Sequence, residues 1–187
     1  MPQTKLLLDT NAYLRLAYSI HPLLFVSFGE KNYTLYVIKD FQDEFDRQSR
    51  LIKKFPWVNE AKFKNNRMKF LTLSKKDKSQ IKTAETYIWD QNMTGNWGAS
   101  PVDVSALAVG YVLDIPVITD DKGMIELAES LGIKVMGMLP LLSKMLTAGH
   151  IDKKKIKELV GWLSYVDDLP YPGFIDDVNA EFGMDLS

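Results

Sequence analysis

The stretch Ser100–Met138, SPVDVSALAVGYVLDIPVITDDKGMIELAESLGIKVMGM, decides the fold class of this chain. It begins with Ser100 and Pro101, which favour the N-cap and the first turn of a helix, and an apolar stripe at helical spacing follows. Two later apolar runs are too short for helices and predict buried strands. This alternation indicates a parallel sheet with helices on both faces. The expected elements are a helix from Pro101, strands over 116–119 and 134–138, and a helix over 122–131.

The same alternation extends toward the amino terminus, whereas residues beyond Leu139 predict helices alone. We therefore expect an α/β core over residues 1–148 and a helical extension over 149–187 that packs on it. The remaining expected strands are 5–8, 33–38 and 70–73, and the remaining helices are 40–54, 77–91, 139–147, 152–164 and 173–182, with a short helix after Asn11 and a loop over 93–99.

The composition favours a folded chain with one main core. Of the 187 residues, 46% are hydrophobic and 25% are charged, which excludes a disordered chain. The absence of cysteine excludes a disulfide scaffold, a thiolate metal site and a cysteine nucleophile. Because the chain has two histidines, we expect any metal to be held by oxygen ligands.

The amino terminus does not read as a signal peptide, because the apolar run over residues 6–8 stops at Asp9. The longest uncharged stretch, Leu16–Gly29, has 14 residues. A membrane-spanning helix needs roughly 18 apolar residues or more. We therefore expect a cytoplasmic protein without a membrane partner.

Acidic side chains follow the predicted strands. Asp9 comes directly after the first strand, and Asp120 and Asp121 follow a later one. Asp103 lies in the first turn of a helix, and Glu44 lies in the helix after the second strand. Ligands of open parallel sheets bind at the carboxyl ends of the strands, so we expect these groups to gather there. Like charges repel, and a cation relieves the repulsion, which predicts a site for Mg²⁺ or Mn²⁺.

Each of these carboxylates also has a purely structural interpretation. Asp9 suits a turn, and Glu44 belongs to an acidic, solvated helix face. Asp103 lies three residues after Ser100 and can complete a capping box. Asp120 can cap the following helix, with Asp121 in its first turn. Their joint placement, rather than any single position, favours a site.

Four segments together resemble the PIN-domain family, which includes metal-dependent ribonucleases and, among them, the VapC toxins of prokaryotic toxin–antitoxin pairs. The resemblance covers the chain from Lys5 to about Gly137, and the order and spacing of the segments agree with the family. The segments are LLLDTNAYL (6–14), VIKDFQDEF (37–45), SPVDVSALA (100–108) and VITDDKGM (117–124).

The resemblance implies a three-layer α/β/α fold around a central parallel sheet. It also implies hydrolysis of RNA phosphodiester bonds with Mg²⁺ or Mn²⁺, leaving a 5′-phosphate. A homodimer and an antitoxin partner are further expectations from the family. By similarity the acidic positions fall on Asp9 as the central ligand, Glu44, Asp103 and Asp121, with Asp120 competing for the fourth role, and the supporting polar positions fall on Asn11 and Thr119.

Residues 47–82 form a basic segment. This segment carries a charge of +10, and the rest of the chain carries −11. The net charge of −1 therefore results from two large opposite charges that cancel. Contact with phosphates is the natural use of such a segment. Its aromatic residues Phe55, Trp57, Phe63 and Phe70 either stack on bases or belong to the core. The residues predicted to bind nucleic acid are Arg47, Arg50, Lys53, Lys54, Lys62, Lys64 and Arg67.

A metal-dependent ribonuclease is the function that this sequence favours, either as a toxin or as an RNA-processing enzyme. One alternative is an RNA-binding module with a degenerate site. The presence of an acidic residue at all four family positions is evidence against this alternative. Another is an aspartyl-phosphate phosphatase with Asp9 as nucleophile, although Asn11 stands where that chemistry wants a second Asp. We also expect the acidic tail beyond Lys157 to lie against the basic segment.

Overall fold

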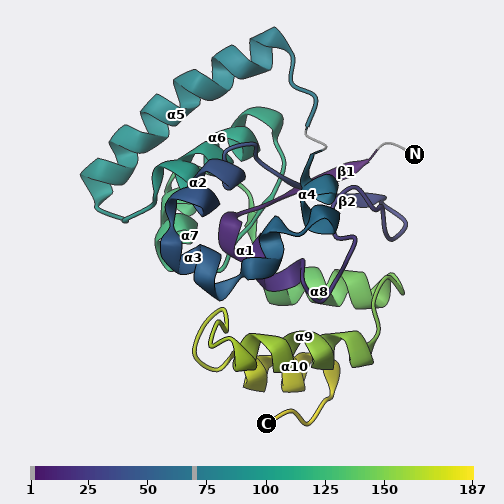
Figure 1. Ribbon diagram of the computed structural model, residues 1–187. Helices are drawn as coiled ribbons and strands as arrows, with labels where there is room; N and C mark the ends of the chain where they lie inside the picture. The colour runs from purple at the N-terminus through teal and green to yellow at the C-terminus, as the bar shows by residue number, and fades with distance from the viewer. Residues whose placement is uncertain (1–2, 69–70) are drawn as a thin grey trace.

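The computed structural model describes residues 3–68 and 71–187 (Figure 1). Within them, four parallel strands form one sheet in the order β2-β1-β3-β4. The chain moves from β1 to β2 on one side and returns to β3 on the other, so the strand order reverses beside β1. The strands are β1 (Thr4–Leu8), β2 (Tyr33–Val37), β3 (Val117–Ile118) and β4 (Val135–Met136).

Alternation along the strands divides the core into two layers. Leu6 and Leu8 of β1 belong to one hydrophobic cluster, whereas Leu7 between them belongs to the other. Leu8 pairs in register with Val37 and Ile118, which lie in the same cluster as Leu8. Successive strand side chains point to opposite faces, so both faces of this sheet are buried.

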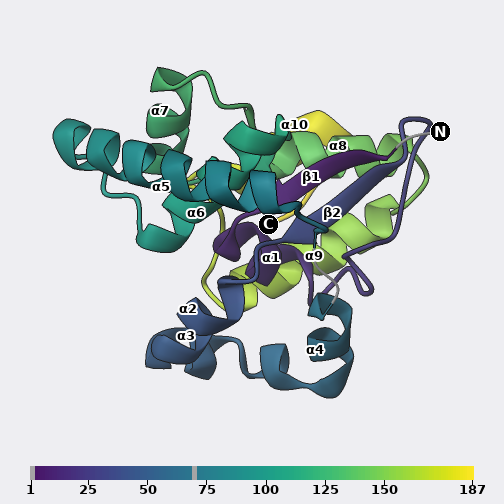
Figure 2. The ribbon, with the colours of Figure 1, turned by 90° about the horizontal axis from the view of Figure 1, so that it is seen from above.

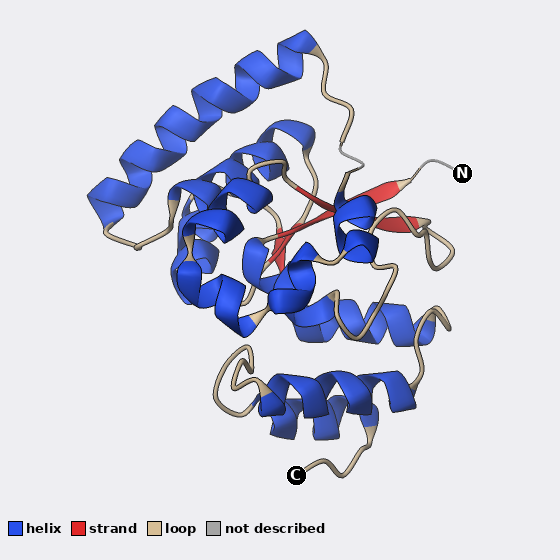
Figure 3. Ribbon diagram, in the orientation of Figure 1, coloured by secondary structure: helices blue, strands red, loops and turns tan. Residues whose placement is uncertain are grey.

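Three helices cover the face that carries Leu7, and seven-residue α1 lies with three later helices on the other (Figure 3). The sheet is thus the middle of three layers, as expected from the sequence. The first group is α5 (Lys75–Gly95), α6 (Pro101–Leu113) and α7 (Lys122–Ser130). The second group is α1 (Thr10–Leu16), α8 (Met138–Thr147), α9 (Lys153–Tyr165) and α10 (Phe174–Phe182).

Serine residues fix the starts of the two longest helices of the first group. Ser74 and Ser100 each accept a hydrogen bond from the backbone of the third helical residue, whose aspartate accepts one in return. These reciprocal capping boxes satisfy backbone donors that a helix start otherwise leaves without partners. The predicted helix start at Pro101 is confirmed, and α5 continues to Gly95, into the stretch expected as a loop.

The segment after β2 differs most from expectation. The single helix predicted over 40–54 is wrong, because Gln48 adopts an extended conformation and divides it into α2 (Phe41–Arg47) and α3 (Ser49–Lys54). The turn lets Phe55 reach the core, where it is 1% exposed. A short 3-10 helix, η1 (Pro56–Asn59), and α4 (Ala61–Arg67) follow, neither of which was predicted. Figure 2 shows α2, α3 and α4 along one side of the molecule.

The strand predicted over residues 70–73 does not form over residues 71–73, the part of this segment that the structure describes. Residues 71–73 are irregular, and Phe70 lies outside the described residues. Across 3–68 and 71–187, no helix combines the length and the apolar character that crossing a membrane requires.

The helices after residue 148 share the core of the α/β layers. Ile156, Leu159 and Leu163 of α9 and Phe174 of α10 are buried in the same cluster as Leu8 of β1. The division into a core and an extension at residue 148 stays a prediction, but these side chains show that the two parts are joined by continuous packing.

Candidate active site

Asp9 is placed by the end of β1 and the start of α1. It is the N-cap of α1, and its Oδ1 accepts a hydrogen bond of 2.5 Å from the backbone N–H of Ala12. The residue is only 3% exposed. Its backbone N–H donates to the carbonyl of Ile118, which ties it to the neighbouring strand. The side chain therefore has one position, at the carboxyl edge of the sheet.

Thr119 connects Asp9 to the acidic residues after β3. Its hydroxyl lies close enough to the Asp9 side chain to lower the pKa of that carboxyl, and its Oγ1 accepts a bond of 3.1 Å from the backbone N–H of Asp121. Asp121 is the N-cap of α7 and accepts a bond of 2.8 Å from the N–H of Met124. Thr119 itself is fully buried. Asn11, the other predicted supporting residue, is exposed on α1.

Asp103 enters the site from the first turn of α6. Its Oδ2 accepts a bond of 2.9 Å from the backbone N–H of Ser100, so the capping box fixes the carboxylate. Asp9 and Asp103 together line a small, partly open cavity between β1, β2 and α6 that is too narrow for a water molecule. The predicted capping role and the predicted site role thus coincide in one residue.

Glu44 is held by a residue that the sequence did not single out. The Thr10 hydroxyl donates a short hydrogen bond to Glu44 Oε2, and Gln48 Nε2 donates to Oε1 at 3.2 Å. Thr10 directly follows Asp9, so one dipeptide positions two of the predicted site carboxylates. In the sequence, the hydroxyl residue directly after Asp9 was the only local indication that Thr10 belongs to the site. Glu44 also lines an open cleft of about 390 Å³ with Arg47 and Ser100.

The carboxylates influence one another through Asp103. Burial raises the pKa of Asp9 from 3.8 to about 7, against the hydrogen bonds from Thr119 and Ala12, and the Asp103 charge raises it further. Burial also raises the pKa of Glu44, and the negative charge of Asp103 raises the same pKa. The pKa of Asp103 rises by burial and by the charge of Asp121. The charge of Asp103 thus acts on both Asp9 and Glu44, and the charge of Asp121 acts on Asp103.

This set of groups fits a hard divalent cation by chemistry. Within residues 3–68 and 71–187, no three His, Cys, Asp or Glu side chains are arranged to hold a metal ion. The donors are nevertheless carboxylate oxygens, which Mg²⁺ and Mn²⁺ prefer. Burying like charges together is costly, and a bound cation offsets that cost. Asp9, Glu44, Asp103 and Asp121 are the residues that would hold it.

Asp120, the predicted competitor of Asp121 for the fourth ligand position, makes different contacts from Asp121. Its Oδ1 accepts a bond of 3.0 Å from the N–H of Met138, and its buried Oδ2 has no partner among the described residues. Burial raises its pKa, whereas the bond from Met138 and the charge of Arg15 lower it. Asp120 therefore contacts the first residue of α8, whereas Asp121 caps α7.

The predicted nucleic-acid contacts fall into three groups. Arg67 is 5% exposed and donates to the hydroxyl of Tyr13 and the carbonyl of Val58, both at 2.9 Å, so its prediction as a phosphate contact is wrong. Lys54 is ion-paired with Asp168 at 2.7 Å, which is where the acidic tail meets the basic segment. The exposed residues are Arg47, Arg50, Lys53, Lys62 and Lys64.

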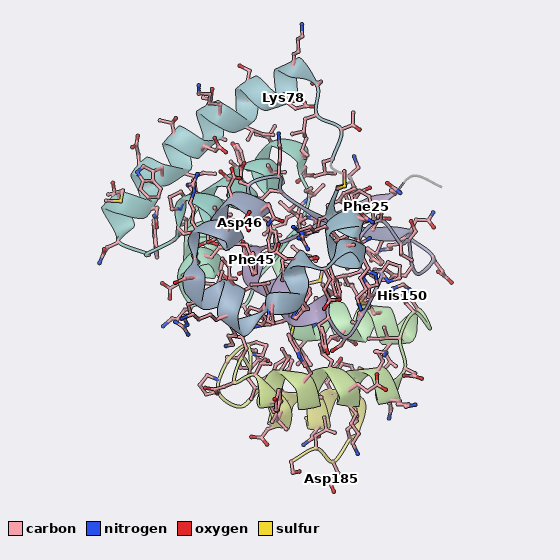
Figure 4. All side chains as sticks on the ribbon, viewed as in Figure 1. Phe25, Phe45, Asp46, Lys78, His150 and Asp185 are labelled. Carbon is pink, nitrogen blue, oxygen red and sulfur yellow. The ribbon has the colours of Figure 1, made fainter. Side chains whose placement is uncertain are left out.

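The aromatic residues of the basic segment belong to the core. Phe55, Trp57 and Phe63 are at most 5% exposed, and the Trp57 and Phe63 rings lie 4.5 Å apart. They are therefore not available to stack on bases, and Phe70 lies outside the described residues. Figure 4 shows the side chains of α2 and α3 in front of the sheet, with Asp46 and Phe45 labelled.

Arg15 is a second residue that the sequence did not reveal. Its Nε donates to Asp168 Oδ2 at 3.0 Å, and its charge lowers the pKa of both Asp9 and Asp120. A lone arginine on an otherwise apolar helix was the signal. It gives the carboxyl edge of the sheet one nearby positive charge.

Comparison with known proteins identifies the family of this chain. The model of a family described as a PIN domain matches residues 58–166, more than half of the chain. The matched segment contains Asp103, Thr119 and Asp121 and begins after Asp9 and Glu44. A search of curated proteins found no match.

Proposed function

Because this chain belongs to the PIN-domain family, whose members are typically nucleases, we propose that it hydrolyses RNA phosphodiester bonds with Mg²⁺ or Mn²⁺ held by its grouped carboxylates. The observation that carries the proposal is the placement of Asp103 within electrostatic reach of Asp9, Glu44 and Asp121. In support of this, Asp9, Glu44, Asp103 and Asp121 come from four separate segments near the carboxyl end of β1. The strand order reverses there, and ligands of such sheets bind at this place.

Asp9, Asp103 and Asp121 are the proposed metal ligands. A bound divalent cation supplies a water of lowered pKa and stabilises charge on the leaving oxygen. Thr119 and the Ser100 backbone keep two of these carboxylates oriented, so their charges face the site before substrate arrives.

Glu44 has the properties of a group that orients the attacking water and accepts its proton. Its pKa is raised by burial and by Asp103, which favours proton uptake nearer to neutral pH. Thr10 and Gln48 bond one oxygen each, which fixes the plane of the carboxylate. Arg47, exposed in the same cleft, is placed to contact a substrate phosphate.

The test is Asp103→Asn, which keeps a side-chain acceptor for the Ser100 N–H but removes the shared charge. We expect cleavage of a labelled single-stranded RNA in Mn²⁺ to fall about a hundredfold or more, equivalent to ~2.7 kcal/mol in the barrier. The matched control is Asp114→Asn at the other end of α6, where the side chain is exposed and pairs with Lys134.

Unchanged cleavage by Asp103→Asn would show that the site lies elsewhere. RNA binding without cleavage by the unaltered protein would instead favour the degenerate module, and a trapped phospho-enzyme would favour the phosphatase. Action as a toxin, pairing with an antitoxin and homodimer formation stay predictions.

A further inference from the structure

A second pocket lies beside the carboxylates and has no part in holding them. It has a volume of about 600 Å³ and lies between the end of β2, the segment 71–73 and α5. We call it the α5 pocket. Figure 1 shows α5 as a long helix along the upper edge of the molecule, and the pocket lies on the side of α5 that faces the sheet.

The floor of the α5 pocket is aliphatic. Its floor side chains come from the end of β2, the segment before α5, and the inner faces of α5 and α6. Flat aromatic ligands bind well in pockets of this kind, in which a few polar groups at the edge set the orientation. The floor residues are Val37, Ile38, Leu71, Leu73, Ile81 and Val109.

Three exposed lysines form the rim. Lys78 and Lys82 lie one turn apart on α5, so their side chains share a face of the helix. Lys39 is the third and follows β2 directly. Figure 4 shows Lys78 on the part of α5 nearest its amino end. None of the three forms an ion pair within the described residues, so their charges are available to a polyanion.

Two carboxylates lie at the side of the pocket toward the active site. Glu85 of α5 is half-buried, and its Oε1 accepts a bond of 2.7 Å from the Ser105 hydroxyl of α6. Asp40, after β2, is exposed. An ionised carboxylate has acceptor sites only, about four of them, so Glu85 can accept a further bond. The pocket therefore offers a ligand both carboxylate acceptors and lysine cations.

The pocket adjoins the proposed active site. Asp40 and Ser105 line both the α5 pocket and the cleft that contains Glu44. Ile38 lines the α5 pocket and also the small cavity of Asp9 and Asp103. A strand with a phosphodiester at the carboxylates therefore has an adjoining place for a neighbouring nucleotide.

We propose that the α5 pocket is a nucleobase subsite that selects a base with an exocyclic amino group close to the cleaved bond. The aliphatic floor contacts the faces of the base, Glu85 accepts from its amino group, and Lys78 and Lys82 bind the phosphates on either side. Carboxylates recognise amino groups of bases in this way, and uracil offers an oxygen at the same position. The inference rests on the proposed function.

The test is a binding measurement without divalent ions, so it does not depend on cleavage. Fluorescence anisotropy is measured in EDTA with labelled twelve-nucleotide RNAs of cytidine alone and of uridine alone. The two bases have the same size and differ in an amino or oxo group. We expect the cytidine RNA to bind about fivefold to tenfold more tightly, equivalent to ~1–1.4 kcal/mol, because cytosine donates an amino hydrogen to Glu85 and uracil does not.

Glu85→Gln tests the selecting group. The amide still accepts the bond from Ser105 but also presents donors, so the preference for cytidine should fall to about twofold or less. Asp90→Asn is the control, because it removes the same charge from an exposed position of α5 outside the pocket. It should leave the preference unchanged.

Lys78→Glu with Lys82→Glu tests the rim. We expect affinity for both RNAs to fall about tenfold and the salt dependence to weaken by ~1.4 in slope, because single strands lose about 0.7 per phosphate contact. The control is Lys75→Glu with Lys76→Glu, which changes the net charge by the same amount on the first turn of α5, outside the pocket. This control pair should lower the RNA affinity clearly less than the rim pair does.

Equal effects of the two lysine pairs, equal affinity for the two RNAs, or a preference that survives Glu85→Gln would each overturn the subsite. These outcomes are separate from the nuclease proposal. A protein that shows the expected binding pattern but does not cleave in Mn²⁺ would keep the subsite and reject the nuclease. A protein that cleaves without the pattern would do the reverse.

Discussion

At the scale of the residue, the site carboxylates serve the fold and the proposed chemistry at once. Asp9 and Asp121 cap helices, and Asp103 completes a capping box. Their positions after strands and at helix starts follow from the sequence, because caps and strand ends leave a local signal. Thr10 and Arg15 left weaker signals, and the burial of Arg67 depends on contacts with Tyr13 and Val58 that no local pattern reveals.

The raised pKa of Asp9 predicts a pH-dependent stability for the metal-free protein. Asp9 is protonated in the folded state up to about pH 7, whereas 3.8 is its ordinary pKa. The folded state therefore binds more protons than the unfolded state within this window. The free energy of unfolding should fall as pH rises across it, by up to about 4 kcal/mol from this group.

Asp9→Asn isolates this contribution, because asparagine keeps an N-cap acceptor and cannot ionise. Urea unfolding at pH 5 and pH 8 should show a smaller loss of stability with pH for Asp9→Asn than for the unaltered protein. Glu44 and Asp103 titrate in the same direction, and Asp103 interacts with Asp9, so the difference between the two proteins measures Asp9 together with its coupling to Asp103. Parallel pH profiles of the two proteins would contradict the assignment.

At the scale of the element, periodicity predicted the helices and strands that form the layers, because each buries one face or both. It failed between residues 48 and 67. Gln48 is not a helix breaker by type, and the chain turns there because Phe55, Trp57 and Phe63 pack into one cluster. Tertiary packing of this kind overrides local preference and is not encoded in a helical or strand period.

Close contact between α6 and β3 predicts a large effect for Gly110→Ala. A Cβ atom at Gly110 would lie 2.6 Å from Val117 Cγ2 and 3.1 Å from the carbonyl of Ile115. Moving α6 away would cost ~1–3 kcal/mol in unfolding free energy and displace Asp103. Gly161→Ala in α9 is the control, since its Cβ meets nothing within 4 Å, and it should stabilise by up to ~1 kcal/mol. Urea unfolding of both variants measures this, and equal effects would contradict it.

Asp168 connects the turn after α9 to two elements of the amino-terminal half. It accepts from Arg15 of α1 at 3.0 Å and from Lys54 of α3 at 2.7 Å. Asp168→Asn should lower the free energy of unfolding by ~1–2 kcal/mol, because both ion pairs are largely shielded from solvent. The loss should shrink in 1 M salt, where charges are screened.

Asp167→Asn is the matched control for this contact. Its side chain is exposed, only its backbone carbonyl bonds Lys54, and its φ of 52° suits asparagine. Thermal unfolding should distinguish the two variants. Equal destabilisation would show that the ion pairs at Asp168 contribute nothing measurable.

At the scale of the molecule, one core joins the sheet to the helices after residue 148. The three-layer architecture was predictable from the alternation of strands and helices, whereas this shared core was not. The sequence of an amphipathic helix shows that one face is buried, but it does not show which surface of the protein covers that face. The near-neutral net charge was equally uninformative, because it sums a basic segment and an acidic remainder.

A shared core predicts one cooperative unfolding transition. Leu163 of α9 is fully buried, and Leu163→Ala should lower the free energy of unfolding by ~2–5 kcal/mol. Far-ultraviolet circular dichroism and the RNA-cleavage activity should be lost together along the same urea curve. Ser164→Ala, exposed at the next position, should change neither. Activity that outlasts the helical signal in Leu163→Ala would show that the helices after 148 form a separable unit.

The packing of α9 and α10 on β1 also sets an order for events on the ribosome. Asp9 is synthesised early, yet Arg15 beside it is bound by Asp168, and Phe182 of α10 fills the cluster that contains Leu8. The nascent chain therefore carries its acidic residues past ribosomal RNA while the layer beneath α1 is still incomplete. The packing around the proposed site is therefore complete only once synthesis has passed residue 182.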